Sequence, residues 1–410
     1  MKKIHYNTIV NAAGEGFWGL VFGFILPATV LTILLEKHGA STMQIAYLSA
    51  VSLAAIPLAS IFSPFLFSST VNRKKKLLLW HYFTVIPCLA IMAVLIFNSD
   101  KVFFFVPLML LIFTFDNFFV GMIVPQWQDW MAHIFPVEKR GFCLSIGFCC
   151  FQLMWLIASF LTAHLIDLFE SKQQFGWLYL LATISGMISI SFFFKLDDSD
   201  MEESPKVPFN EIIEDMKSSF ANKNFLVFVA GKVCLIAGLC MLPFITLYYK
   251  SPEGGNLNDQ TIIRVSCCMT LCGAAFGILM GRLGDRKGHR IGFIICSILL
   301  AATLSIPIFS SGILSSIACF SAFGLTIGSF YVSNYNLILE TCPHKNRIAH
   351  ITLNNLLFGV CAVIIPLSMG KIRDIHGFKT AMIASALVTL IATFISVVGM
   401  KEPRKLSTDL

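Results

Sequence analysis

Charged side chains are scarce in this sequence. Only 13% of the 410 residues are Asp, Glu, Lys or Arg, whereas a soluble domain carries about 25%. Hydrophobic residues make up 56% of the chain, and the mean hydropathy is +0.78. A chain this long with so little charge cannot cover its surface for water, which excludes a soluble globular protein and indicates a membrane protein.

Several chemical signatures are also missing. The sequence has no Walker-type phosphate loop, no H-E-x-x-H motif and no G-x-S-x-G motif, so nothing indicates ATP hydrolysis or hydrolase chemistry. None of the 13 cysteines forms a CxxC pair or a Cys/His ligand spacing. We therefore expect no cofactor, no metal site and no disulfide framework, and we predict that the protein is not an enzyme.

The apolar residues come in runs of about 20, the length that crosses a ~30 Å hydrocarbon core as a helix, and the alternation of a β-barrel is absent. We predict an all-α membrane protein with twelve transmembrane helices. Prolines at 27, 57, 243 and 366 fall inside these runs, where we expect kinks. The predicted spans are 11–35, 43–67, 77–97, 102–125, 141–166, 175–195, 225–249, 262–281, 291–310, 313–339, 348–371 and 378–400.

One polar, acidic segment divides the chain into six spans plus six. We predict an N-terminal six-helix bundle at 1–195, a cytoplasmic linker at 196–223, a C-terminal six-helix bundle at 224–400 and a cytoplasmic tail at 401–410. A Pro-x-x-x-Arg sequence follows both span 4 (136–140) and span 10 (343–347). Matching signals at matching positions indicate two pseudo-symmetric bundles made from a duplicated unit.

The formal net charge is +7, and its distribution predicts the orientation of the chain. If both termini lie inside, the inner segments, together with Lys195 at the inner end of span 6, carry 21 of the 30 Lys and Arg residues. This positive-inside bias predicts a multi-pass protein of the cytoplasmic (inner) membrane with both termini cytoplasmic. The basic residues therefore report topology, and we expect no nucleic-acid partner.

The segment between spans 8 and 9 reads G-R-L-G-D-R-K-G-H-R over residues 281–290. It resembles the cytoplasmic loop signature of the major facilitator superfamily, G-x-x-x-D-R-x-G-R-R/K, in its second-half copy. The resemblance implies a secondary transporter in which this loop acts as a conformational latch. The alternative is a plain tight turn with positive-inside charges. The latch residues implied are Gly281, Gly284, Asp285, Arg286, Gly288 and Arg290.

A glycine stripe on span 8 bears on its packing. Gly273, Gly277 and Gly281 recur every four residues, which predicts that another helix approaches span 8 closely.

Two further sequence features bear on the family. The sequence from Trp127 to Trp130 and beyond resembles the W-x-x-W-M-A pattern of poorly characterised bacterial members, although an interfacial tryptophan belt explains it equally well. The intramembrane signatures of proton-coupled drug antiporters are missing from spans 4 and 5, which favours uptake or metabolite exchange over drug export.

Charges within spans cost about 2.5–3.5 kcal/mol each on insertion scales, so they usually face a cavity and serve a function. The spans contain Glu15, Asp116 and Lys232, in spans 1, 4 and 7, and the resemblance implies that spans 1, 4, 7 and 10 line a central cavity. A carboxylate in a medium of low dielectric can exchange a proton near neutral pH. The predicted substrate-binding and ion-coupling residues are Glu15, Asp116, Asn117, Lys232, Tyr331, Asn334 and Asn336.

Each of these assignments has a structural alternative. Lys232 could extend its amine to the membrane surface, and Glu15 could cap or flank the start of span 1. Polar side chains of span 10 could serve interhelical hydrogen bonds. Trp18 and Trp155 could stack on a ring-bearing substrate or could pack within the bundle.

We therefore predict a secondary active transporter of a small solute that works by alternating access with proton coupling. The expected partners are a small-molecule substrate, protons and the lipid bilayer, and the chain is expected to be monomeric. The alternatives are a drug or metabolite efflux pump and a transporter-like sensor that binds its ligand without net flux.

Overall fold

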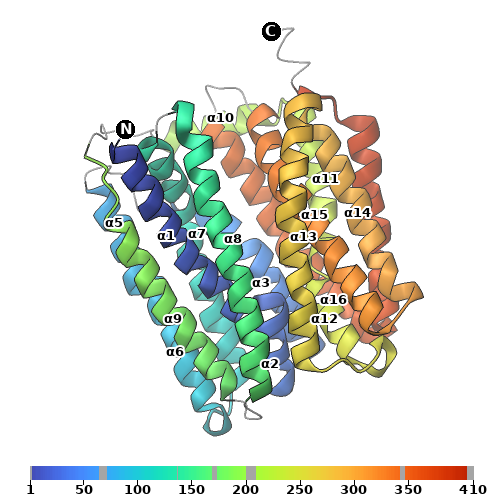
Figure 1. Cartoon of the computed structure of the whole chain (residues 1–410). Helices are drawn as coiled ribbons and strands as arrows, with labels where there is room; N and C mark the ends of the chain where they lie inside the picture. Colours follow the sequence, from blue (N-terminus) through green and yellow to red (C-terminus); the bar gives the residue numbers. More distant parts are fainter. Residues whose placement is uncertain are drawn as a thin grey trace. The chain divides into compact units, whose positions relative to one another are not determined.

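The computed structural model describes residues 2–63, 72–135, 137–168, 173–199, 209–341 and 347–403. Within these ranges the chain is helical and contains no strand (Figure 1). The prediction of an all-α membrane protein is thereby confirmed.

The chain divides into two compact units. Unit 1 comprises Met1–Ala40 and Leu58–Lys206, and unit 2 comprises Ser41–Pro57 and Val207–Leu410. Helix α3, Thr42–Ser60, thus begins in unit 2 although it belongs to the first half of the sequence. The bundle boundaries expected around the 196–223 linker stay a prediction.

Unit 1 is built from long helices joined by short turns. Its elements are α1 (Lys2–Ile25), η1 (Pro27–Leu31), α2 (Thr32–Lys37), α5 (Arg73–Trp80), η2 (His81–Val85), α6 (Ile86–Phe97), η3 (Ser99–Lys101), α7 (Phe105–Ile134), α8 (Val137–Leu168) and α9 (Gln174–Phe193).

Unit 2 has the same character. After α3 its elements are α10 (Phe209–Ser219), α11 (Lys223–Leu239), α12 (Leu242–Lys250), η4 (Pro252–Gly254), α13 (Asp259–Lys287), α14 (His289–Phe309), α15 (Gly312–Thr341), α16 (Arg347–Phe394) and η6 (Ile395–Gly399).

Eleven helical runs within the described ranges are long and apolar enough to cross a bilayer. The last of them, His350–Gly399, has 50 residues, about twice the length that a bilayer requires. Gly377 inside it has φ 83° and ψ 174°, which no helix contains, so α16 is two helices joined end to end. This break lies between predicted spans 11 and 12, and the run therefore accounts for both.

Two of the four prolines at which kinks were expected break their helices. Leu26, which precedes Pro27, has φ −47° and ψ 112°, and the chain resumes in the π-helical turn η1. Helix α11 ends at Leu239, and α12 begins beside Pro243. Pro57 and Pro366 instead lie inside continuous helices. The first span of each half is thus interrupted near its middle.

Glycines bring two helices of unit 1 together. A Cβ on Gly19 of α1 would overlap the backbone of Phe151 of α8. A Cβ on Gly23 would lie 2.5 Å from the Trp155 carbonyl oxygen and from the Ala158 Cβ. Since lipid offers no hydrophobic drive for helix association, such close backbone packing supplies the attraction.

Glycines also bring two helices of unit 2 together, along the glycine stripe predicted for span 8. Gly273 and Gly277 of α13 meet Gly324 and Gly328 of α15. A Cβ on Gly324 would overlap the Met269 carbonyl, and a Cβ on Gly328 would overlap the backbone of Gly273 and Gly277. The expected close approach of another helix to span 8 is therefore confirmed at Gly273 and Gly277, where the partner is α15, and is wrong at Gly281, where nothing lies within 4 Å of a Cβ.

This contact yields a test of packing. We expect Gly328→Ala to lower the free energy of unfolding by about 1–3 kcal/mol, because the added methyl forces α13 and α15 apart. Gly281→Ala is the matched control, since nothing lies within 4 Å of a Cβ there. Helix propensity should make that variant neutral or more stable by up to about 1 kcal/mol. Thermal unfolding in detergent measures both, and equal effects would contradict the glycine contact.

Candidate functional site

Glu15 lies in the interior of α1. Because α1 begins at Lys2, Glu15 is about 20 Å along the helix axis from its start. The alternative in which it caps the start of this helix is therefore wrong, whereas the alternative in which it lies near the membrane surface stays open. Its side chain lies against Gly147 of α8, where a Cβ would come within 3.2 Å of the Glu15 Cγ.

Asn11 lies one turn before Glu15 and shares this contact with Gly147. It is buried, and its Oδ1 has no hydrogen-bond partner among the described residues. Nothing in the sequence distinguishes Asn11 as a site residue, because it lies at the predicted edge of span 1 and carries no charge. The helix start at Lys2 moves both residues inward.

Asp116 faces the interior of unit 1. It is 9% exposed, and its Oδ1 has no hydrogen-bond partner within the described part of the chain. Its carboxyl group is near enough to Cys88 of α6 and Tyr179 of α9 for its charge to act on both groups. The next residue, Asn117, donates from Nδ2 to the Phe113 carbonyl at 2.9 Å. Asp116 is thus a buried acid without a cationic partner in the described structure.

Lys232 of α11 is buried in unit 2, with 5% exposure. Its ammonium donates to Asn354 Oδ1 at 3.2 Å and lies 4.5 Å from the centre of the Phe358 ring. Both partners belong to α16. The alternative in which Lys232 extends to the membrane surface is therefore wrong, because its amine is held inside the unit by an amide oxygen and an aromatic face.

The polar residues of α15 differ in their exposure and partners. Tyr331 is 68% exposed, and the Oδ1 of Asn334 has no hydrogen-bond partner among the described residues. Asn336 donates from Nδ2 to the Val332 carbonyl of its own helix at 2.8 Å. Tyr331, Asn334 and Tyr335 share one face of the helix, since they are three and four residues apart. This face offers hydroxyl and amide groups to a ligand.

The three charged residues predicted to form the site thus have different neighbours. Glu15 and Asp116 belong to unit 1, and Lys232 belongs to unit 2. Asp116 lies beside α6 and α9, whereas Glu15 lies beside α8. The predicted grouping of these charges around a single cavity stays a prediction.

The proposed latch segment is a tight turn at the end of α13. The helix runs through Gly281, Gly284 and Arg286 to Lys287, and α14 begins at His289. Only Gly288 separates the two helices, with φ 88°. A Cβ on Gly288 would overlap the Glu402 carboxylate. The side chain of Asp285 is outside the described residues, so its expected contact with Arg286 or Arg290 stays a prediction.

Arg290 fixes this turn to the last helix of unit 2. Its Nε donates to the Ser396 carbonyl at 3.2 Å, and its guanidinium donates to the Val397 carbonyl at 2.7 Å. Beside it, the buried His289 lies 4.0 Å from the Glu340 carboxylate of α15. The turn is therefore tied to two other helices of its own unit.

The corresponding end of unit 1 is held by the segment after α9. Lys74 donates to the Leu196 carbonyl at 2.5 Å and pairs with Asp198 at 3.4 Å. Trp130 donates to the same carboxylate at 3.3 Å. Trp130 is fully buried and Trp127 packs against it at 5.2 Å between ring centres, so the interfacial-belt interpretation is wrong for Trp130.

Asp197 forms a second tie at this end. Its backbone exchanges two hydrogen bonds with the Asn7 side chain, at 2.8 and 2.9 Å. Its carboxylate accepts hydrogen bonds from the Ser199 hydroxyl and amide and pairs with Lys3 at 3.1 Å. These interactions, led by the Ser199 hydrogen bonds, lower the pKa of Asp197 to about 2, and they join the start of α1 to the end of α9.

Trp18 and Trp155 belong to an aromatic cluster between α1 and α8. Both rings contact Phe22, at 6.4 and 5.7 Å between centres, and Trp155 also contacts Phe151 at 5.7 Å. The Nε1 of Trp155 has no acceptor within the described residues. The cluster supports the packing interpretation for both tryptophans, and it leaves one indole N–H available to an acceptor.

Comparison with known proteins identifies the fold. The family model described as Major Facilitator Superfamily matches residues 14–257 and 256–409. A search of curated proteins finds no match to this chain. A POT family transporter in complex with a thioalcohol-conjugated peptide is 12% identical with a TM-score of 0.72, over 95% of each chain. A D-xylose–proton symporter is 12% identical, with a TM-score of 0.72, over 98% of this chain and 99% of its own. The nucleoside transporter NupG is 14% identical, with a TM-score of 0.66, over 97% and 98%.

The interaction between Lys232 and Asn354 can be tested by a double-mutant cycle. We expect Asn354→Leu to lower the free energy of unfolding by about 1–3 kcal/mol, because it removes the acceptor of a buried ammonium. Lys232→Met combined with Asn354→Leu should recover most of this loss, since no buried charge is then left. Titration with a denaturing detergent in mixed micelles measures these differences.

The matched control for this cycle is Asn336→Leu, because Asn336 donates only within its own helix. Its effect should add to that of Lys232→Met without coupling. Additive losses for the Lys232 and Asn354 variants would contradict the interaction between them.

Proposed function

Because the chain belongs to the major facilitator superfamily, we propose that it moves a small solute across a membrane by proton-coupled secondary transport with alternating access. The family match extends over both halves of the sequence, and the solved structures similar to it are transporters. Family and fold favour a transporter over an enzyme.

The burial of Asp116 is the observation that carries the coupling proposal. An ionised carboxylate without a partner is costly in a medium of low dielectric. Protonation removes the charge, and with it that cost. Asp116 is 9% exposed with an unpaired oxygen, so proton uptake and release there would change the electrostatic energy of unit 1. Glu15, against Gly147, is the second candidate for a coupling residue.

The polar groups available to a ligand favour a neutral polar or zwitterionic solute. In unit 1 these are the Glu15 carboxyl, the Asn11 Oδ1 and the Trp155 N–H. In unit 2 they are Tyr331 and Asn334 on α15. The similar structures are described as a D-xylose–proton symporter, a nucleoside transporter and a POT family transporter in complex with a peptide conjugate, and all three of these molecules present several hydrogen-bonding groups. We extend that solute class to this chain.

The proposal also covers the orientation of the chain in the membrane and its oligomeric state. The positive-inside distribution supports the cytoplasmic membrane with both termini inside, and we propose that the chain acts as a monomer. Export of a drug or metabolite and ligand sensing without flux are the alternatives. The missing antiporter signatures favour uptake or exchange over the first.

Transport is tested in proteoliposomes that are supplied with a pooled metabolite extract under an imposed pH gradient. We expect one solute to accumulate, and we expect a protonophore to abolish its accumulation. Mass spectrometry of the vesicle contents identifies the solute. Absence of flux together with ligand-induced thermal stabilisation would contradict transport and favour the sensor.

Proton coupling is tested with that solute and the variant Asp116→Asn. We expect accumulation driven by the pH gradient to fall at least about tenfold, because an amide cannot carry the proton. Exchange of solute at equal concentrations should persist, which shows that the variant is folded. Glu214→Gln, an exposed acid in α10, is the matched control and should accumulate solute normally. Undiminished accumulation by Asp116→Asn would exclude Asp116 as the coupling residue.

A further inference from the structure

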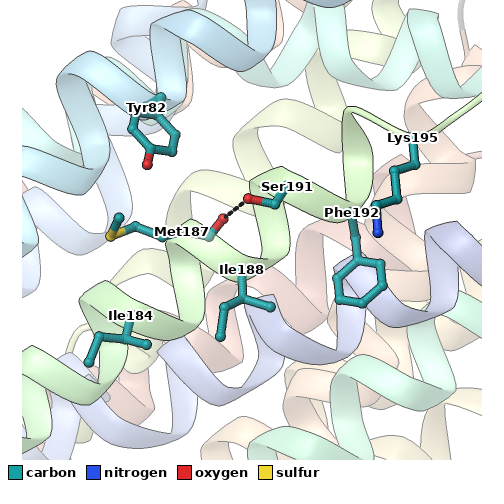
Figure 2. A pocket seen from close by; sticks show the side chains of 7 residues that line it. All are labelled: Tyr82, Ile184, Met187, Ile188, Ser191, Phe192 and Lys195. Carbon is teal, nitrogen blue, oxygen red and sulfur yellow. Dashed lines mark hydrogen bonds between the residues drawn. The ribbon is translucent and has the colours of Figure 1, made fainter.

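A groove of about 480 Å³ runs along α9 beside η2. Figure 2 shows its lining, with Tyr82 on the neighbouring helix opposite Met187. Its volume falls within the roughly 300–1,000 Å³ of ligand pockets. The groove lies wholly within unit 1, and none of the residues that line it is a predicted transport residue.

The groove follows from the spacing of residues on α9. Ile184, Ile188 and Ser191 recur at intervals of four and three, which places them on one face of the helix, and Lys195 follows in the turn after the helix ends at Phe193. Ser191 is much smaller than its neighbours and leaves the hollow. Its hydroxyl donates to the Met187 carbonyl at 2.8 Å (Figure 2). The walls along α9 are thus mainly apolar, and the Ser191 hydroxyl is satisfied within the helix, while Tyr82 adds a phenolic hydroxyl from the neighbouring helix.

A positive charge marks one end of the groove. Lys195 is exposed, and its ammonium lies 5.1 Å from the centre of the Phe192 ring. It has no ion-pair partner among the described residues. The nearby acids have other partners, since Asp197 pairs with Lys3 and Asp198 pairs with Lys74.

Two further lysines increase the charge at this end. The contact of Lys74 with the Leu196 carbonyl places the start of α5 beside the end of α9. Lys75 and Lys76 follow on α5, and both are exposed. Neither forms an ion pair in the described part of unit 1. Three ammonium groups without acidic partners therefore lie at or near one end of an apolar groove.

We propose that this groove binds an anionic phospholipid from the membrane leaflet at the end of unit 1 where α1 begins and α9 ends. Lys195 contacts the phosphate, Lys75 and Lys76 add to its attraction, and one acyl chain lies along Ile184, Ile188 and Phe192. Helix α9 ends at Phe193, so Lys195 is at the level where a span leaves the hydrocarbon and headgroups begin. Basic side chains at that level attract anionic lipids by about 1 kcal/mol each.

Other occupants explain fewer of these features. A soluble acidic peptide would satisfy the lysines but not the apolar walls, which extend along a membrane span. A zwitterionic phospholipid would fill the groove and gain little from three ammonium groups. The combination of charge at one end with an apolar wall along the span favours a lipid with a net negative headgroup.

The test uses the purified full-length protein in detergent, with phosphatidylglycerol and phosphatidylcholine of identical acyl chains as probes. Native mass spectrometry measures the dissociation constant of each adduct. We expect phosphatidylglycerol to bind at least about fivefold more tightly, the ratio that one ammonium group contributes. Lys195→Gln should weaken phosphatidylglycerol binding about fivefold and leave phosphatidylcholine binding unchanged.

Two variants complete the design. Ser191→Leu fills the hollow and keeps every charge, so it should weaken the binding of both lipids. Lys223→Gln removes an exposed lysine from the start of α11 in unit 2 and should change neither. Thermal unfolding without added lipid confirms that each variant is folded.

Several results would overturn the proposal. Equal affinity for the two lipids, or an unchanged dissociation constant in Lys195→Gln, would show that the groove has no preference for an anionic headgroup. If Ser191→Leu weakened binding but Lys195→Gln did not, the groove would bind acyl chains without regard to the charge of the headgroup. Equal losses in Lys195→Gln and Lys223→Gln would indicate a diffuse effect of net charge.

Discussion

Hydrocarbon provides no hydrogen bonds, and the rest of this structure depends on that constraint. Every backbone polar group must find its partner within the chain, so the spans are helices. Side-chain hydroxyls follow the same rule. Thr8, Thr84, Thr114 and Thr183 each donate to the carbonyl four residues earlier in their own helix. Polar groups that lack such local partners are therefore exceptional and informative.

Asp116 and Lys232 show two outcomes of this constraint. Lys232 is buried with an amide oxygen and an aromatic ring arranged around its ammonium, as a charge with a fixed structural partner would be. Asp116 is comparably buried, yet one of its oxygens has no partner in the described structure. A group that must change its protonation state during a cycle is not served by a permanent cation beside it. This difference makes Asp116 the stronger candidate for coupling.

The same constraint removes the hydrophobic drive for helix association, and both units replace it with close backbone contact. Gly19 and Gly23 let α1 approach α8, and Gly273 with Gly277 lets α13 approach α15. The groove along α9 is an exposed surface that is not used in this way, and the lysine at its end distinguishes it from an ordinary apolar helix face.

The sequence by itself determined the number and approximate positions of the spans, the glycine stripe on span 8 and the tight turn between spans 8 and 9. Each of these depends on local hydrophobic length, on the missing side chain of glycine or on its conformational freedom. Only the tertiary structure decided the partners. It directed the Lys232 amine to Asn354, 122 residues away, buried Trp130, and placed Glu15 deep in a helix that begins at Lys2. The rotation of a helix about its axis and the choice of its neighbours are set by contacts between residues far apart in the chain, which hydropathy does not encode.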